Sequence, residues 1–184
     1  MKRLEVRPAF VALVCLLFYI SPLRVFLPFL TMALLHELGH LAALAMLGVE
    51  VKRIRLGALG TTIETGALPP VQEIVCALAG PAVNLLCFWA LKERFFGAAL
   101  FSLLFGCYNL LPVYPLDGGR ALRALLCLWL PARVATGIEI AVAIVLLSGI
   151  GLAAIRLKYT LGLLPLWLFG SLLGHLCLEE ALLK

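Results

Sequence analysis

The fold of this chain is decided by Leu34-Leu35-His36-Glu37-Leu38-Gly39-His40-Leu41, an HExxH sequence inside an apolar run. Successive residues of a helix are about 100° apart, so His36 and His40 lie one turn apart on one face, with Glu37 at its edge. Apart from the two histidines, Glu37 is the only ionisable residue between positions 25 and 47. At about 1.5 Å per residue this run is roughly 35 Å long, enough to cross a bilayer. The stretch therefore predicts a metal centre below a membrane surface.

The residue types of this stretch favour hydrolytic chemistry. Two imidazoles one helical turn apart can hold Zn²⁺, and an adjacent carboxylate can take a proton from a water molecule on the metal. Because zinc lowers the pKa of such a water toward about 7, Glu37 is the candidate general base that would pass a proton to the leaving amine. Gly39 lies near His36 on the helix and is expected to leave space for a substrate.

Composition indicates a helical membrane protein. The chain has 184 residues, of which 64% are hydrophobic, and its mean hydropathy is +1.10. Ionisable residues gather between long apolar runs, which is typical of polytopic proteins. The net charge of +5 is carried at the ends of these runs, where it would set topology, so nucleic-acid binding is not expected. The six cysteines form no CxxC pair, so a disulfide framework is not expected either.

The predicted fold class is an all-α polytopic membrane protein with about six transmembrane helices and a small β-hairpin at the membrane surface. We expect one membrane-embedded domain over residues 1–184, with a core at 8–130 and additional C-terminal helices within 134–180. The N-terminal run is interpreted as an uncleaved first helix. The expected spans and one short helix at 121–130 follow from the apolar runs. The spans are 8–23, 25–47, 74–91 (opened by Pro69-Pro70), 95–116, one within 134–155 and one within 159–178.

The hairpin is predicted at residues 51–66, where basic and apolar residues alternate around a glycine-rich turn at 57–60. It is the only pair of strands that the pattern supports. An exposed strand edge there could pair with an extended peptide. A solvated connector whose charges set the topology explains the pattern equally well, so both interpretations stay open.

Polar residues inside the later spans need partners at membrane depth. Asn84 follows Gly80-Pro81, a pair that favours close helix approach or a kink, and it is expected either to form an interhelical hydrogen bond or to contact a substrate. Glu139 is expected to lie close enough to the surface to reach water or Arg133.

The segment Asn109-Leu110-Leu111-Pro112-Val113-Tyr114-Pro115-Leu116-Asp117-Gly118-Gly119-Arg120 is predicted to break a helix, because it holds two prolines three residues apart. Unwound backbone at membrane depth must be buried in protein or face a cavity. Asn109 and Asp117 are therefore expected to face an interior polar site. Asp117 is the candidate third metal ligand, beside two intramembrane histidines.

The distribution of charge predicts the topology. With six crossings both termini lie on one side, and ten of the 15 lysines and arginines would lie on the side of the termini. The positive-inside rule then places the termini, the hairpin and the opening of the site on the cytoplasmic side of a multi-pass cell-membrane protein.

These motifs occur in one order, and together they resemble the site-2 protease family of intramembrane zinc metalloproteases (peptidase family M50), in particular the branch that contains stage IV sporulation protein FB. The resemblance covers about residues 8 to 130. It implies one zinc ion per chain, held by His36, His40 and Asp117, with Glu37 as the catalytic base. It also implies substrate-handling roles for Asn84, Asn109 and the segment around Pro115. The PDZ or CBS domains that many members carry are not expected within these 184 residues.

The predicted function is intramembrane proteolysis by a zinc metalloendopeptidase. The resemblance implies substrates among membrane-embedded or membrane-associated regulatory proteins, such as pro-sigma factors in sporulation. Expected partners are the substrate, the lipid bilayer, and regulatory membrane proteins or a second copy of the chain. The alternative is a non-enzymatic metal-binding membrane protein or a metal transporter, which should place polar groups on several spans.

Overall fold

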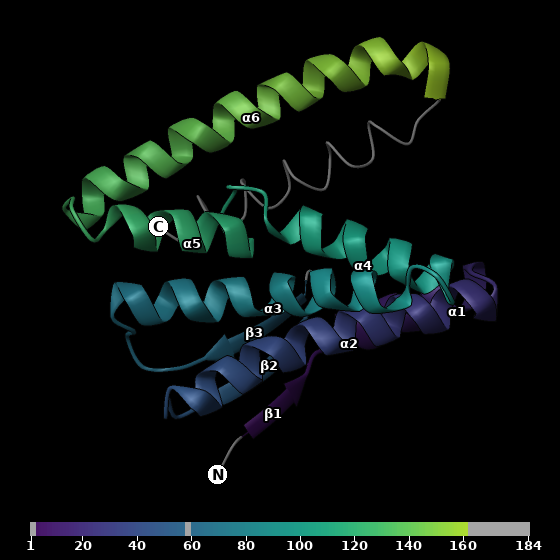
Figure 1. The fold of residues 1–184 in the computed structure, drawn as a ribbon, viewed down its shortest axis with the longest axis horizontal. Coiled ribbons are helices and arrows are strands. Elements are labelled where there is room, and N and C mark those ends of the chain that lie inside the picture. The colour runs from purple at the N-terminus through teal and green to yellow at the C-terminus, as the bar shows by residue number, and fades with distance from the viewer. Residues whose placement is uncertain (1–2, 58–59, 162–184) are drawn as a thin grey trace. The chain divides into compact units, whose positions relative to one another are not determined.

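The computed structural model describes residues 3–57 and 60–161, and it confirms a mostly helical chain with a small sheet (Figure 1). The chain forms two compact units, Met1–Tyr108 and Asn109–Lys184. In chain order the elements are β1 (Arg3–Val6), α1 (Pro8–Ile20), α2 (Leu23–Met46), β2 (Arg53–Gly57), β3 (Gly60–Glu64), α3 (Pro70–Leu91), α4 (Phe96–Asn109), α5 (Asp117–Leu126) and α6 (Ala132–Leu161).

In the described part of the chain three helices are long and apolar enough to cross a membrane, namely α2, α3 and the first 22 residues of α6. Helices α1 and α4 are apolar but shorter. A chain with three such helices is a membrane protein. The predicted break between residues 155 and 159 is wrong, because α6 runs without interruption to Leu161. Most of the predicted sixth span, from residue 162 onward, lies outside the described residues.

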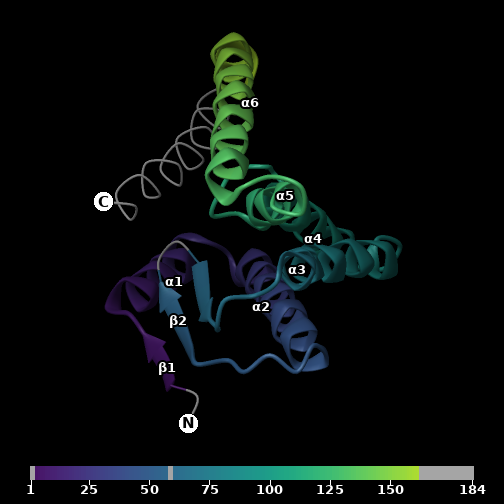
Figure 2. The ribbon, with the colours of Figure 1, turned by 90° about the vertical axis from the view of Figure 1, so that its left-hand side faces the viewer.

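Helix α2, which carries the HExxH motif, lies side by side with α3 in the first unit (Figures 1 and 2). The buried face of α2 repeats every three or four residues, as expected for one side of a helix. At Gly39 a Cβ atom would lie 2.9 Å from the carbonyl oxygen of Ala79 on α3. The absence of a side chain there brings two backbones together, so the expectation that Gly39 leaves space for a substrate is wrong.

The hairpin is confirmed, and the sheet has a third strand that the sequence pattern did not predict. Strands β2 and β3 pair antiparallel, with Ile54 opposite Ile63, and β1 pairs parallel with β2 in the order β1-β2-β3. β1 has only four residues, too few for a periodic signal. Its Glu5 carboxylate lies 3.4 Å from the Arg55 guanidinium and 3.6 Å from that of Arg53, which compensates the positive charge of β2.

In the second unit the helix after the two prolines begins earlier than predicted. α5 starts at Asp117 instead of residue 121 and ends at Leu126 instead of 130. The helix before it, α4, ends at Asn109, so the predicted span 95–116 is helical only over 96–109. Gly118 and Gly119 belong to the first turn of α5, and their lack of side chains lets this turn lie against the backbone of residues 110–114.

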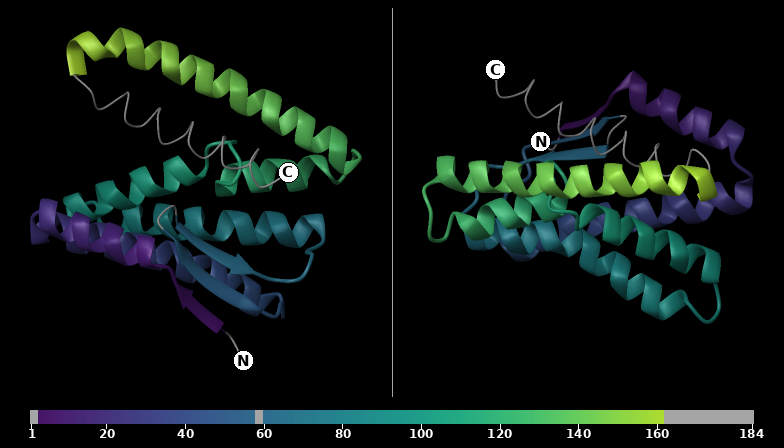
Figure 3. Two further views of the ribbon diagram at one scale, coloured as in Figure 1. Left: turned by 180° about the vertical axis from the view of Figure 1, so that it is seen from behind. Right: turned by 90° about the horizontal axis from the view of Figure 1, so that it is seen from above.

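Helix α6 follows α5 after a short connection and packs against it (Figure 3). The buried residues of α6 recur every four positions, at Ala135, Glu139, Ala143 and Leu147. Glu139 is 0% exposed. The expectation that it reaches water or Arg133 is therefore wrong. It lies on the face of α6 that is buried, where its partners come from α5 and from the loop before it.

Candidate metal centre

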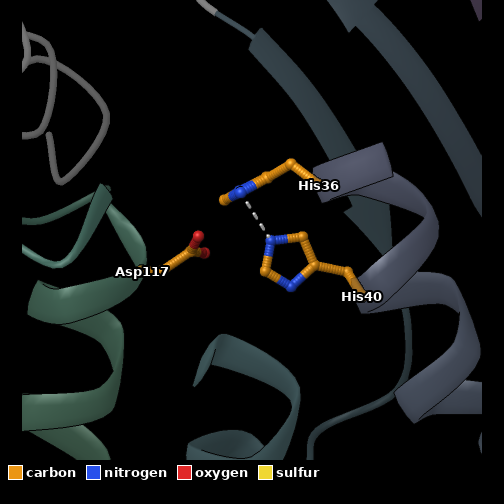
Figure 4. Close-up of side chains that lie close together, drawn as sticks. All are labelled: His36, His40 and Asp117. Atoms are coloured by element: carbon orange, nitrogen blue, oxygen red, sulfur yellow. Dashed lines mark hydrogen bonds between the residues drawn. The ribbon is translucent and has the colours of Figure 1, made fainter. Parts of the chain in front are cut away.

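The two histidines of the HExxH motif project from α2 into a buried space in the first unit (Figure 4). Their side chains belong to residues that are 3% and 7% exposed. The Nε2 atom of His36 lies 3.1 Å from the Nε2 atom of His40. Their rings meet edge to face at a centroid distance of 4.7 Å, as one helical turn of separation allows.

Hydrogen bonds on the opposite side of each ring fix which nitrogen faces inward. His40 donates from Nδ1 to the backbone carbonyl of Cys76, at 2.7 Å. His36 donates from Nδ1 to the side-chain oxygen of Asn84, at 3.1 Å. Since a neutral imidazole carries one proton, both Nε2 atoms are left as the atoms able to coordinate. This is the usual arrangement of metal-binding histidines, whose second nitrogen donates to a carbonyl or carboxylate.

The spacing of the two Nε2 atoms fits a zinc ion. Tetrahedral zinc with nitrogen ligands at about 2.0–2.1 Å separates two of them by roughly 3.3 Å, close to the 3.1 Å seen here. Gly80 on α3 lies directly beside them, and a Cβ atom on Gly80 would lie 2.8 Å from the Nε2 of His36 and would overlap that of His40. The space next to both coordinating atoms therefore exists because position 80 has no side chain.

Asn84 joins α3 to both of its neighbours in the first unit. It is 1% exposed. Its oxygen accepts from His36, its amide nitrogen lies 3.4 Å from the carbonyl of Ser102 on α4, and the Ser102 hydroxyl donates to the carbonyl of Asn84 at 2.8 Å. Of the two roles predicted for Asn84, the interhelical hydrogen bond is the one observed. Contact with a substrate stays a prediction.

Asp117 is the first residue of α5, in the second unit. It is 6% exposed. A carboxylate in the first turn is favoured by the helix dipole, and Arg120 one turn later lies 3.4 Å from Oδ1. Gly118 and Gly119 set the position of this turn, because side chains on them would overlap Leu110 and Tyr114 backbone atoms. Asp117 is thus a buried carboxylate on a backbone held by close contacts.

Among the described residues, His36 and His40 of the first unit and Asp117 of the second are buried side chains that each offer a ligand atom for a metal ion. Figure 4 draws these three side chains. Two imidazole nitrogens and a carboxylate oxygen make a donor set that zinc takes in hydrolytic enzymes. The role of Asp117 as the third ligand stays a prediction.

The other predicted site residues lie on or next to these elements. Glu37 is half-buried on α2, one residue after His36. Asn109 is half-buried and ends α4, and Pro115 is exposed in the loop before α5, after a cis peptide bond with Tyr114. No contact of these three with a substrate is tested, so their roles stay predictions.

Residues that the sequence analysis did not assign to the site also shape it. Gly80 was expected only to bring helices together, and Ser102 was not singled out. For Gly80 the signal was its spacing of four residues from Asn84, which puts both on one face of α3. Ser102 gave no signal, because a serine within an apolar helix usually bonds to its own helix.

Comparisons with known proteins point to a family of metalloproteases. Residues 86–149 match the model of peptidase family M50. A zinc metalloprotease of Methanocaldococcus jannaschii is 33% identical over 105 residues, which are 50% of this chain and 31% of that protein. Stage IV sporulation protein FB of Bacillus subtilis is 33% identical over 128 residues, 61% of this chain and 44% of that protein. The chain therefore spans less than half the length of these two relatives.

The fold is similar to that of a site-2 protease from Methanocaldococcus jannaschii, with a TM-score of 0.65 and 24% identity, over 94% of this chain and 90% of that one. The match to peptidase family M50 covers the third motif, at residues 109–120, and it agrees with the resemblance to site-2 proteases that the motifs predict, as do the names of the two relatives.

Proposed function

We propose that this chain is an intramembrane zinc metalloendopeptidase that hydrolyses peptide bonds in membrane-embedded or membrane-associated regulatory proteins. The observation that supports it best is the pair of buried Nε2 atoms 3.1 Å apart on the HExxH helix. The names of the relatives, zinc metalloprotease and stage IV sporulation protein FB, support the same chemistry. By that likeness, processing of a regulatory factor in sporulation is one form the function would take.

In this proposal one zinc ion per chain is held by His36, His40 and Asp117. A bound zinc ion supplies a Lewis acid that lowers the pKa of a water molecule toward about 7 and makes it nucleophilic. The carboxylates of Glu37 and Asp117 offset the charge of a dication, which reduces the cost of placing acids at membrane depth. Asn84 and the Cys76 carbonyl keep both imidazoles oriented toward the ion.

Glu37 acts as the general base and then as the acid in this mechanism. It lies one residue from His36 on the edge of the ligand face of α2 and is half-buried. From there its carboxylate takes a proton from the attacking water and delivers it to the leaving amine. The apolar helices around the pair keep bulk water out, which strengthens each electrostatic interaction at the site.

The substrate enters as an extended segment, because the carbonyls of an intact helix are already hydrogen-bonded and covered. Strand β3 has β2 as its sheet neighbour among the described residues, so its other edge can pair with such a segment. We assign substrate handling to Asn109, Pro115 and Asn84. For Asn84 this means the hydrogen-bonding capacity that its bonds to His36 and Ser102 leave over. The full chain forms one protease domain with six crossings, cytoplasmic termini and a cytoplasmic opening, and the bilayer, regulatory membrane proteins and a second copy are its partners.

The test compares wild type with Glu37→Gln in two assays. In the first, each protein is purified in detergent and cleaves fluorescein-labelled casein. In the second, each is co-expressed with tagged single-span membrane proteins, and their cleavage is followed in cells. We expect Glu37→Gln to lower the rate by about 100-fold or more, as loss of a general base does, while zinc content stays at one ion per chain. The matched control is Glu93→Gln, which removes an exposed carboxylate that follows α3 and should cleave as wild type does. Cleavage by Glu37→Gln at the wild-type rate would contradict the proposal.

The alternative, a metal transporter or non-enzymatic metal-binding protein, makes a different prediction. A transport path needs polar groups along several helices, whereas the buried acid of α6, Glu139, is held in an ion pair with Arg123. Zinc uptake into proteoliposomes, measured with a trapped fluorescent indicator, decides between them. The proposal expects bound zinc without flux, and saturable flux without proteolysis would favour the alternative.

A further inference from the structure

The proposed mechanism leaves one fully buried acid without a task. Glu139 on α6 is 0% exposed. It lies within an apolar helix whose other buried residues nearby are alanine and leucine. An ionised carboxylate in such a place is costly unless it is paired and hydrogen-bonded. The contacts of the Glu139 carboxylate therefore indicate its structural role.

Both oxygens of Glu139 have partners within the second unit. Oε1 accepts from the backbone N–H of Tyr114 at 3.0 Å, and Oε2 accepts from Nη2 of Arg123 at 2.7 Å. Arg123 belongs to α5, and its guanidinium also lies over the ring of Tyr114, 4.0 Å from its centroid. One carboxylate thus connects α6 to α5 and to the loop before α5.

The loop needs such a partner because it has no helix to satisfy its backbone. Residues 110–116 lie between α4 and α5, and two backbone bonds stabilise them internally, Val113 N–H to Leu111 and Leu116 N–H to Val113. The N–H of Tyr114 is bonded instead to Glu139. A buried backbone donor without an acceptor is rare in native proteins, so removal of this acceptor should shift the loop.

A shift of this loop is passed to Asp117 by direct contact. Gly119 is so close to Val113 and Tyr114 that a Cβ atom there would overlap their backbone, and Gly118 is equally close to Leu110. The loop and the first turn of α5 therefore move together. Asp117 is the first residue of α5 and directly follows the loop. Arg123, the partner of Glu139, lies six residues later on the same helix.

We propose that Glu139, together with Arg123, is a positioning residue for the metal centre: it holds the loop at Tyr114 and so sets the place of the Asp117 carboxylate. This inference rests on the proposed role of Asp117 as a zinc ligand. Groups that orient a metal ligand from outside the coordination sphere are worth about 10–100-fold in metal affinity. We expect an effect of that size for Glu139, although it contacts no ligand itself.

The experiment is a double-mutant cycle on zinc affinity in detergent, measured by competition with a chromogenic chelator. Four full-length proteins are compared: wild type, Glu139→Leu, Asp117→Asn and the double variant, because leucine removes both acceptor oxygens of Glu139 whereas glutamine would keep one. We expect Glu139→Leu to weaken zinc binding by about 10-fold or more in the wild-type background, and by less than about twofold with Asp117→Asn, since coupled residues are not additive. The matched control is Arg133→Gln, which removes an exposed charge from the same helix and should leave the affinity unchanged.

Each result decides the inference. Equal losses in both backgrounds would show that Glu139 acts through general stability, which overturns the proposal, as would wild-type affinity in Glu139→Leu. If Glu139→Leu does not yield folded protein, Arg123→Lys replaces it in the cycle. Lysine keeps the charge but loses the planar group that bonds to Glu139 and stacks on Tyr114. A folded Arg123→Lys protein with wild-type affinity would also overturn it. A wild-type protein that binds zinc and cleaves substrate leaves the proposed function standing in each case, whereas one that does neither removes both.

Discussion

The two regions that carry the candidate ligands are built in different ways. The histidines lie on α2 beside α3, two continuous helices whose backbone is bonded mainly within each helix, and the site is shaped by Gly39 and Gly80. Asp117 follows a loop of seven residues whose backbone is partly bonded to a side chain, Glu139. In the first region, small residues let helices approach. In the second, close contacts and an ion pair replace the missing helical bonds.

The two regions should differ in how well they tolerate substitutions. A helix pair tolerates a small change at its interface, because side chains can move while the backbone bonds stay intact. A loop at membrane depth has few alternatives for its backbone, so a small change should displace it as a whole. Substitutions of similar size should therefore differ in effect between the two regions.

Gly118→Ala should have the largest effect. Its Cβ atom would overlap the carbonyl oxygen of Leu110, a backbone atom that cannot rotate away. We expect a loss of stability of at least about 3 kcal/mol, at the upper end for overpacking, seen as a lower thermal midpoint in detergent and loss of zinc. Gly137→Ala on α6 is the control, because its Cβ atom would meet nothing within 4 Å. A Gly118→Ala protein as stable as that control would show that the loop is not tightly held.

Gly80→Ala should lower activity strongly while the fold persists. The new Cβ atom would displace the two imidazoles, which are held at their Nδ1 atoms and cannot both yield. Because misplacement of a reacting group by about 1 Å can cost about 100-fold in rate, we expect casein cleavage to fall by about that factor. Gly97→Ala on α4, with open space around its Cβ atom, should cleave normally. Unchanged cleavage by Gly80→Ala would place the metal elsewhere.

Asn84→Ala should weaken zinc binding without unfolding the protein. It removes the acceptor for the Nδ1 proton of His36, and such outer-sphere partners are worth about 10–100-fold in affinity. The chelator competition assay measures it. If cleavage falls and zinc affinity does not, the predicted contact of Asn84 with substrate is the better assignment, and its orienting role is wrong.

Ser102→Ala should have the smallest effect. Its hydroxyl donates to the carbonyl of Asn84 at 2.8 Å, between α4 and α3. Interhelical hydrogen bonds in membrane proteins contribute about 0.6 kcal/mol on average, so we expect a small drop in thermal midpoint and zinc affinity within about twofold of wild type. A tenfold loss of affinity would show that Ser102 positions Asn84 directly.

Most of the helical framework could be predicted from the sequence, because each long apolar run between prolines, glycines and charges has one plausible structure in a membrane. The histidine pair was predictable for the same reason: helical spacing alone puts His36 and His40 on one face. The start of α5 was not, since Gly118-Gly119 resembles a turn until the backbone beside it is known. Strand β1 is too short for a pattern, and its pairing depends on Arg53 and Arg55, fifty residues later.

The environment of Glu139 could not be predicted either. A single acid near the start of an apolar helix usually lies close to the membrane surface. Its burial depends on Arg123 and on the backbone N–H of Tyr114, and neither is visible as a partner in the sequence. The same is true of Gly39, whose contact with Ala79 decides between space for a substrate and close helix packing.

X-ray absorption spectroscopy of the zinc-loaded protein reports the ligands of the metal, so it tests whether His36 and His40 hold the ion. For wild type we expect two imidazole nitrogens at about 2.0–2.1 Å together with oxygen ligands, and loss of one imidazole in His40→Ala. A sulfur ligand at about 2.3 Å, or an unchanged imidazole signal in His40→Ala, would contradict a centre built on His36 and His40.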